Sequence, residues 1–146
     1  MKFPIAFFLF FLSFFISCEG DSDNNDDNPC LIDQNVNFRL NLDLPLYADL
    51  KFSGNDLLLR NSVNFIEGVY ITRQGDIFTA IELAEPNNCL QTCSSYTLKD
   101  GFFTYSCDDI TNKYDISGNK IDRKDGEFNM RRYNTSLSGN ILTISY

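Results

Sequence analysis

The chain has 146 residues, enough for one domain with a modest hydrophobic core. Its formal net charge is −8, and loss of an N-terminal leader with Lys2 would leave 11 basic and 20 acidic side chains, a net charge of −9. This acidity argues against nucleic acid or anionic lipid as a partner, because both require positive charge. The chain has no histidine, the commonest general base, so we expect no enzymatic activity.

The N-terminus has the anatomy of a secretory signal peptide. Residues 3–16 are apolar or small and follow Lys2. This run is shorter than the roughly 20 residues of a membrane-spanning helix, which disfavours a permanent transmembrane anchor. Ser17 directly precedes Cys18 at the end of the run, and this arrangement resembles a bacterial lipobox. The resemblance implies removal of residues 1–17 and acylation of Cys18, whose lipid chains would hold the protein on a membrane. An ordinary secretory signal with an incidental cysteine is the alternative.

Residues 18–29 form the next segment, in which positions 19–28 are acidic, amide, serine or glycine residues. Nothing there can be buried, so we expect a solvated tether. An acidic run after a lipidated cysteine also resembles the surface-export signals of some Gram-negative lipoproteins. The resemblance implies display on the cell surface from the outer membrane. A simple spacer explains the same residues and would leave the domain facing the periplasm.

Residues 30–146 have the pattern of short β-strands, with no helical stripe of convincing length. Residues 36–42 alternate apolar and polar side chains, as a half-buried strand does. Hairpin turns are expected at residues 74–76, 99–101 and 138–140, each between short apolar runs. This pattern predicts one all-β domain, a small antiparallel sandwich or barrel. Isolated carboxylates in strand-like stretches, such as Glu67 and Glu82, are interpreted as exposed surface charges.

Four cysteines follow Cys18, namely Cys30, Cys89, Cys93 and Cys107. An even number of cysteines in a secreted chain indicates disulfides. Four cysteines allow three pairings, and the count alone leaves all three open.

Two segments separated by a hairpin resemble the cluster-binding loops of the Rieske iron–sulfur domain. They are Glu-Pro-Asn-Asn-Cys-Leu-Gln-Thr-Cys-Ser at residues 85–94 and Tyr-Ser-Cys-Asp-Asp at residues 105–109. Residues 114–118 are similar to the aromatic-to-glycine segment after the second loop, and residues 41–50 resemble the opening of small Rieske-like lipoproteins. The resemblance covers most of the chain from Cys30 onward and implies a Rieske-like fold.

The same resemblance implies that the cluster is absent. The family holds one iron with two thiolates and the other with two imidazoles, from a Cys-x-His and a Cys-x-x-His pair. These positions fall on Glu85 and Asn87 in the first loop and on Tyr105 and Asp108 in the second. None is a thiolate or an imidazole, so we expect no [2Fe–2S] cofactor and no metal site.

The family also suggests how the cysteines pair. Rieske domains of respiratory and photosynthetic complexes join their two loops by a disulfide, whose positions fall on Cys93 and Cys107. The resemblance therefore implies a Cys93–Cys107 bond, with Cys30 and Cys89 as the remaining pair.

These features favour a non-enzymatic binding or structural module that contacts an unknown envelope or extracellular partner. The alternative is a Rieske-type electron carrier with altered ligands, for example a site of four thiolates, although the cysteine spacing matches neither ferredoxin pattern. A Ca²⁺ site formed by Asp108 and Asp109 with Glu85 and Asp115 is a further hypothesis. A solvated acidic loop explains those residues more simply, because their spacing fits no known calcium loop.

Overall fold

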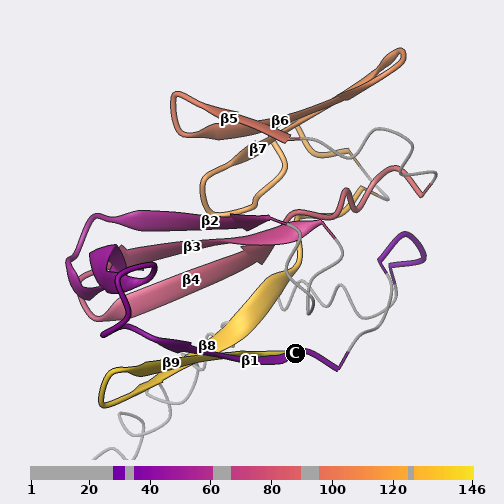
Figure 1. Ribbon diagram of the computed structural model, residues 1–146. Helices are drawn as coiled ribbons and strands as arrows, with labels where there is room; N and C mark the ends of the chain where they lie inside the picture. The colour runs from indigo at the N-terminus through magenta and orange to yellow at the C-terminus, as the bar shows by residue number, and fades with distance from the viewer. Residues whose placement is uncertain (1–27, 32–34, 61–66, 90–95, 125–126) are drawn as a thin grey trace, which may run out of the picture.

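The computed structural model describes residues 28–31, 35–60, 67–89, 96–124 and 127–146 (Figure 1). Within these ranges the chain forms antiparallel strands and one 3-10 helix, and no α-helix. The strands lie in two sheets, one of which curls over a core. The prediction of a small all-β sandwich or barrel is therefore confirmed.

The larger sheet has six strands in the order β1-β9-β8-β4-β3-β2, and the smaller has three in the order β5-β6-β7. The larger sheet consists of β1 (Asn37–Asn41), β2 (Asp56–Arg60), β3 (Gly68–Gln74), β4 (Ile77–Glu82), β8 (Arg132–Ser138) and β9 (Ile141–Ser145). The smaller sheet consists of β5 (Tyr96–Lys99), β6 (Phe102–Cys107) and β7 (Ile110–Asp115). The 3-10 helix η3 (Ala48–Lys51) lies between β1 and β2 in the chain.

The larger sheet folds back on itself at β8. This strand pairs with β4 at two positions only, Ala80 with Tyr133 and Ile81 with Arg132, and it pairs with β9 from Asn134 onward. In Figure 1, β8 crosses from the layer of β2, β3 and β4 to the layer of β1 and β9. The first core fills the space between these layers and contains Val36, Leu40, Leu42, Leu50, Val69, Ile71, Phe78, Ala80, Tyr133, Leu142 and Ile144.

The strand β4 is buried on both faces. Successive side chains of a strand point to opposite faces, so Phe78 and Ala80 enter the first core while Ile81 enters a second. This second core lies between the larger and the smaller sheet. There Tyr70 of β3 packs edge to face against Phe103 of β6, with ring centroids 5.0 Å apart. The residues that follow β4 in the chain therefore start from a strand that packs between the two cores.

The three predicted hairpins are confirmed as β3–β4, β5–β6 and β8–β9. At the second of these, Asp100 and Gly101 both have positive φ, 52° and 79°. Positive φ at both central residues is the requirement of a type I′ turn, and Asp-Gly meets it at little cost. A further hairpin, β6–β7, was not predicted: Cys107 pairs with Ile110, so only Asp108 and Asp109 form its turn.

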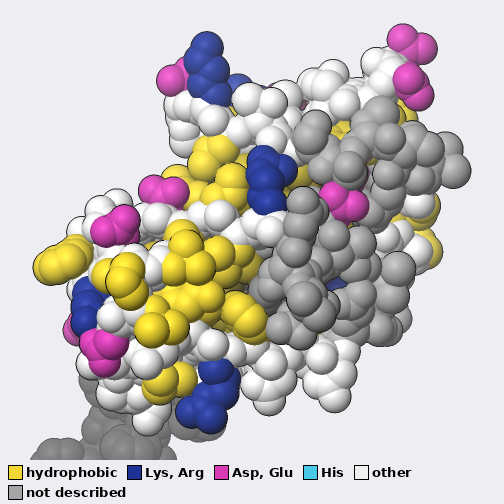
Figure 2. All heavy atoms as spheres, viewed as in Figure 1, with side chains coloured by type: hydrophobic (Ala, Val, Ile, Leu, Met, Phe, Trp, Pro, Cys, Tyr) yellow, Lys and Arg dark blue, Asp and Glu magenta, His cyan; other side chains and the backbone are white. Residues whose placement is uncertain are grey.

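Apolar side chains gather on the surface around η3 (Figure 2). Leu44, Leu46 and Phe52, which flank this helix in the chain, are all at least half exposed. The candidate site lies at the opposite end of β4, beyond Glu82 (Figure 1).

Candidate functional site

Glu85 lies three residues beyond the end of β4, and only 2% of its surface is exposed. Its carboxylate accepts four hydrogen bonds. The donors are Tyr96 Oη at 2.6 Å, Tyr114 Oη at 2.5 Å, Asn112 Nδ2 at 2.9 Å and the backbone N–H of Asn87 at 3.0 Å. A buried carboxylate is costly unless such donors replace water. We call these five residues the Glu85 network.

The alternation of side chains along a strand determines where the donors of the smaller sheet lie. Asn112 and Tyr114 are both buried and alternate on β7 with the exposed Lys113, so they point to the same face. Tyr96 is the first residue of β5, on the other side of β6. The Glu85 network thus joins the segment after β4 to both edge strands of the smaller sheet.

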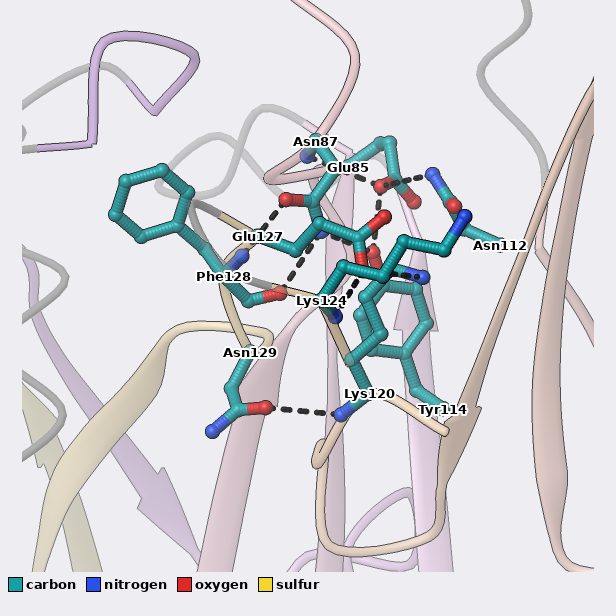
Figure 3. Close-up of polar contacts among 9 residues, drawn as sticks. All are labelled: Glu85, Asn87, Asn112, Tyr114, Lys120, Lys124, Glu127, Phe128 and Asn129. Carbon is teal, nitrogen blue, oxygen red and sulfur yellow. Dashed lines mark hydrogen bonds and ion pairs between the residues drawn. The ribbon is translucent and has the colours of Figure 1, made fainter. Parts of the chain in front are cut away.

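Asn87 extends this network to a third segment. Its Nδ2 donates to Tyr114 Oη and to the carbonyl oxygen of Phe128, each at 2.8 Å. Its Oδ1 accepts the N–H of Phe128 at 2.7 Å. The side chain therefore holds the backbone of Phe128 by both its donor and its acceptor (Figure 3). This geometry makes Asn87 a structural clamp.

The phenols of the Glu85 network are kept protonated. Burial raises the pKa of Tyr96 and of Tyr114 far above the ordinary value of 10.0, and the nearby charge of Glu85 raises both pKa values further. A protonated phenol can donate to the carboxylate, whereas a phenolate would repel it. The arrangement is a set of neutral donors around one carboxylate.

The structure brings three of the four predicted cluster-ligand positions together. Besides Glu85 and Asn87, Tyr105 lies nearby: its Oη accepts a hydrogen bond from Asn88 at 3.1 Å, and its ring centroid lies 5.5 Å from that of Tyr96. Tyr105 belongs to β6, so it lies in a strand and not in a loop. Asp108 is separate, because it is exposed in the β6–β7 turn with a φ of 51°.

The start of the domain is fixed beside Glu85. Cys30 and Cys89 form a disulfide across 59 residues of sequence, which confirms that pairing. Asn28 is buried, and it donates through Nδ2 to the carbonyl oxygen of Pro86 at 3.0 Å. Its Oδ1 accepts the N–H of Cys30 at 2.8 Å.

Two of the predicted cysteine assignments lie outside the described residues. Cys93 is in the range 90–95 and Cys18 in the range 1–27. The Cys93–Cys107 disulfide and the lipidation of Cys18 stay predictions.

A pocket of about 300 Å³ opens beside the Glu85 network. It is lined by Cys30, Pro86, Asn87, Ile110, Asn112, Glu127 and Phe128. Asn112 belongs to the network and also faces this pocket, where it is 7% exposed. Asn112, Glu127 and Phe128 were not identified as site residues from the sequence, because no short motif marks them.

Among the described residues that line this pocket, Glu127 is the charged one. Its Oε2 accepts the backbone N–H of Lys124 at 2.8 Å and lies 3.3 Å from Lys120 Nζ (Figure 3). The hydrogen bond from Lys124 is the main cause that lowers the pKa of Glu127, and Lys120 lowers it further. Glu127 is thus a carboxylate whose charge is balanced by a neighbouring ammonium group.

The acidic residues considered for Ca²⁺ do not converge. Glu85 is enclosed by its donors, whereas Asp108 lies in the exposed turn. Asp115 accepts the N–H groups of Ser117 and Asn119 at 2.8 and 2.9 Å and so stabilises its own turn. Across the described ranges no group of three or more His, Cys, Asp or Glu residues could hold a metal ion.

The interpretation of Glu82 as a surface charge is wrong. Glu82 is 3% exposed, and its Oε2 lies 3.4 Å from Nη1 of Arg131, which is 1% exposed. Burial raises the pKa of Glu82, while Arg131 and a hydrogen bond with Tyr133 lower it. The guanidinium carbon of Arg131 lies 4.4 Å from the ring centroid of Tyr146. We call Glu82 and Arg131 the buried ion pair.

Comparisons with protein-family models, with curated proteins and with solved structures give no match. In the described part of the chain no helix is long and apolar enough to cross a membrane. The Rieske resemblance therefore rests on the sequence segments that carry it.

Proposed function

We propose that this chain is a lipid-anchored outer-envelope protein whose Rieske-like domain is a cluster-free binding or structural module. The observation that carries the proposal is the Glu85 network. Glu85 and Asn87, at the positions of the first Rieske ligand pair, are both engaged by hydrogen bonds within the protein. These side chains stabilise the loop where the family would hold iron.

The donor chemistry does not fit a [2Fe–2S] cluster. The four aligned positions offer a carboxylate, an amide, a phenol and a second carboxylate, whereas the cluster requires thiolates and imidazoles. A site of four thiolates is also disfavoured, because Cys30 and Cys89 are bonded to each other. Electron transfer with altered ligands is therefore the weaker hypothesis.

The proposal includes how the protein is attached to the membrane and which part of the domain is displayed to a partner. Acylation of Cys18 would anchor the protein in the membrane, and residues 18–29 would form the tether to the domain. The disulfide and Asn28 fix the first described residues beside the candidate pocket. A tether that enters there would leave the η3 end of the domain free for an envelope or extracellular partner, on the cell surface or facing the periplasm.

Metal analysis, visible absorption and thiol counting of the protein isolated from its native membrane test the proposal. We expect less than stoichiometric iron, no visible iron–sulfur absorption and no free thiols after denaturation without reductant. Mass spectrometry of the N-terminal peptide should show an acylated Cys18. A coloured protein that contains iron and reduced cysteines would contradict the proposal and restore electron transfer.

A further inference from the structure

The pocket beside the Glu85 network has both polar and apolar walls. Asn112 and Glu127 supply side-chain hydrogen-bonding groups, and Pro86, Ile110 and Phe128 supply apolar surface. Its volume of about 300 Å³ is at the lower end of the range for small-molecule sites, roughly 300–1,000 Å³. A pocket of this size suits one small ring and not an extended ligand.

Asn112 retains hydrogen-bonding capacity that no side chain or backbone group of the described residues uses. Its Nδ2 donates one bond to Glu85, and among the described residues this is the contact of its side chain. A primary amide has two N–H donors and an acceptor oxygen, so one donor and the oxygen are left for a ligand. Asn112 is nine-tenths buried and lines the pocket, where a ligand or water can satisfy this unused capacity.

Glu127 offers an acceptor in the same pocket. Its contacts with Lys124 and Lys120, among the residues described, are made through Oε2, which leaves Oε1 available. The charge of Glu127 is balanced by Lys120, so the wall residues that the structure describes carry no uncompensated charge that would select an ionic ligand. The pocket thus presents two acceptors and one donor at low net charge.

From this combination we infer that the pocket binds a neutral polyol ring, a single sugar residue. A hydroxyl group both donates and accepts, so neighbouring hydroxyls can engage the Asn112 amide and the Glu127 carboxylate together. The apolar faces of Phe128, Pro86 and Ile110 would contact the C–H surface of the ring. The inference deepens the proposed function, on which it rests, by naming the ligand class of the binding module.

The rigidity of the walls supports a preformed site. Asn87 holds the backbone of Phe128 by two hydrogen bonds, and Glu85 holds Asn112. The Cys30–Cys89 disulfide fixes the wall contributed by Cys30. Preorganised side chains lose little conformational entropy on binding, which raises the affinity for a small ligand.

The test is a titration of the isotope-labelled full chain with glucose, galactose, mannose and N-acetylglucosamine, followed by NMR. At least one sugar should shift the side-chain NH₂ signals of Asn112, with a dissociation constant in the millimolar range. Cyclohexanol, which matches the ring size but has one hydroxyl, and ethylammonium should cause no saturable shift. The absence of a response to every sugar, or an equal response to cyclohexanol or ethylammonium, would overturn the inference.

Two variants locate the binding. Phe128→Ala and Glu127→Gln should each weaken sugar binding about tenfold, equivalent to about 1.4 kcal/mol. Phe52→Ala, at the opposite end of the domain, is the matched control and should bind like the unmodified chain. Phe128→Leu replaces Phe128→Ala if the latter fails to fold. An iron-loaded protein would refute the proposed function whether or not it binds sugars. An iron-free protein that binds none of the sugars would refute this inference alone.

Discussion

The Glu85 network and the buried ion pair stabilise two buried carboxylates that lie three residues apart in the chain, and they do so in different ways. Each buries one carboxylate, with Glu85 2% and Glu82 3% exposed. Glu82 faces a single guanidinium, that of Arg131 on the segment entering β8. Glu85 faces four neutral donors contributed by β5, β7 and its own loop. One cation, beside a hydrogen bond from Tyr133, stabilises the charge of Glu82, whereas several neutral donors share the hydrogen bonds to Glu85.

This difference follows from where each carboxylate lies. Glu82 is still in a strand, and its backbone N–H donates to the carbonyl oxygen of Arg131 at 2.9 Å, so strand pairing places the two side chains together. Glu85 has left the sheet and lies where the two sheets meet, within reach of phenol and amide groups of the smaller sheet. Removal of the counter-charge of Glu82 should therefore destabilise the fold more than removal of one acceptor from the Glu85 network.

Arg131→Met is expected to have the largest effect. It leaves Glu82 buried without its cation, which typically costs about 3–5 kcal/mol of unfolding free energy. Arg132→Met, an exposed neighbour, is the matched control and should cost less than about 1 kcal/mol. Urea unfolding at neutral pH measures both. The double variant Glu82→Met with Arg131→Met should recover most of the stability, because an apolar pair needs no counter-charge.

The same variant has a defined pH dependence. Burial raises the pKa of Glu82 above 4.5, so the folded state favours the protonated form, and stability falls as pH rises through the folded pKa. Without Arg131, which lowers this pKa, the fall should deepen and extend to higher pH. Arg131→Met should therefore approach the unmodified chain in stability when the solution is acidified toward pH 4.5. An equal deficit at all pH values would contradict the ion-pair explanation.

Glu85→Gln is expected to have a smaller effect, about 1–3 kcal/mol. The substitution keeps the shape but replaces one acceptor oxygen with a donor, so at least one of the phenols of Tyr96 and Tyr114 loses its partner. Glu127→Gln, a more exposed carboxylate in the same region, should change stability by less than about 1 kcal/mol. Unlike the ion pair, the network has no single partner whose removal would rescue the variant. A neutral effect of Glu85→Gln would show that the network contributes little.

The strands and most turns could be predicted from sequence because they depend on local patterns. Alternation of apolar residues gave the strand around Leu40, and Asp100 with Gly101 gave a tight turn. The β6–β7 turn was missed because Asp108 and Asp109 carry no glycine, although Asp108 adopts a positive φ. Aspartate tolerates this conformation better than most residues, but the signal is weak.

The site could be predicted only in part. The family resemblance pointed to Glu85 and Asn87, but as positions of lost ligands and not as the centre of a hydrogen-bond network. The burial of Glu82 was missed because its partner, Arg131, lies 49 residues away on the segment that enters β8, a strand whose pairing no local pattern reveals. Glu127 and Phe128 were missed for the same reason, because tertiary contacts that no local pattern reveals bring them to the pocket.

The weakest expected effect is in the alkaline titration of the tyrosines, which compares the two regions in one experiment. Burial raises the pKa of five of the seven tyrosines above 10.0, that of Tyr70 to about 12. The folded state therefore holds these protons more tightly than the unfolded state. The stability that follows is complete below pH 10 and is lost as pH rises through the folded pKa values.

Phenolate absorbance near 295 nm should accordingly lag behind that of the denatured chain and rise together with unfolding. Glu85→Gln should lower the pKa values of Tyr96 and Tyr114 only modestly, because burial is the larger cause and the charge of Glu85 the smaller. Arg131→Met should act in the opposite direction on Tyr133, since Arg131 lowers that pKa. A lower pKa of Tyr96 and Tyr114 in Glu85→Gln and a higher pKa of Tyr133 in Arg131→Met would show that the two regions differ. Shifts of the same sign in both variants would contradict this difference.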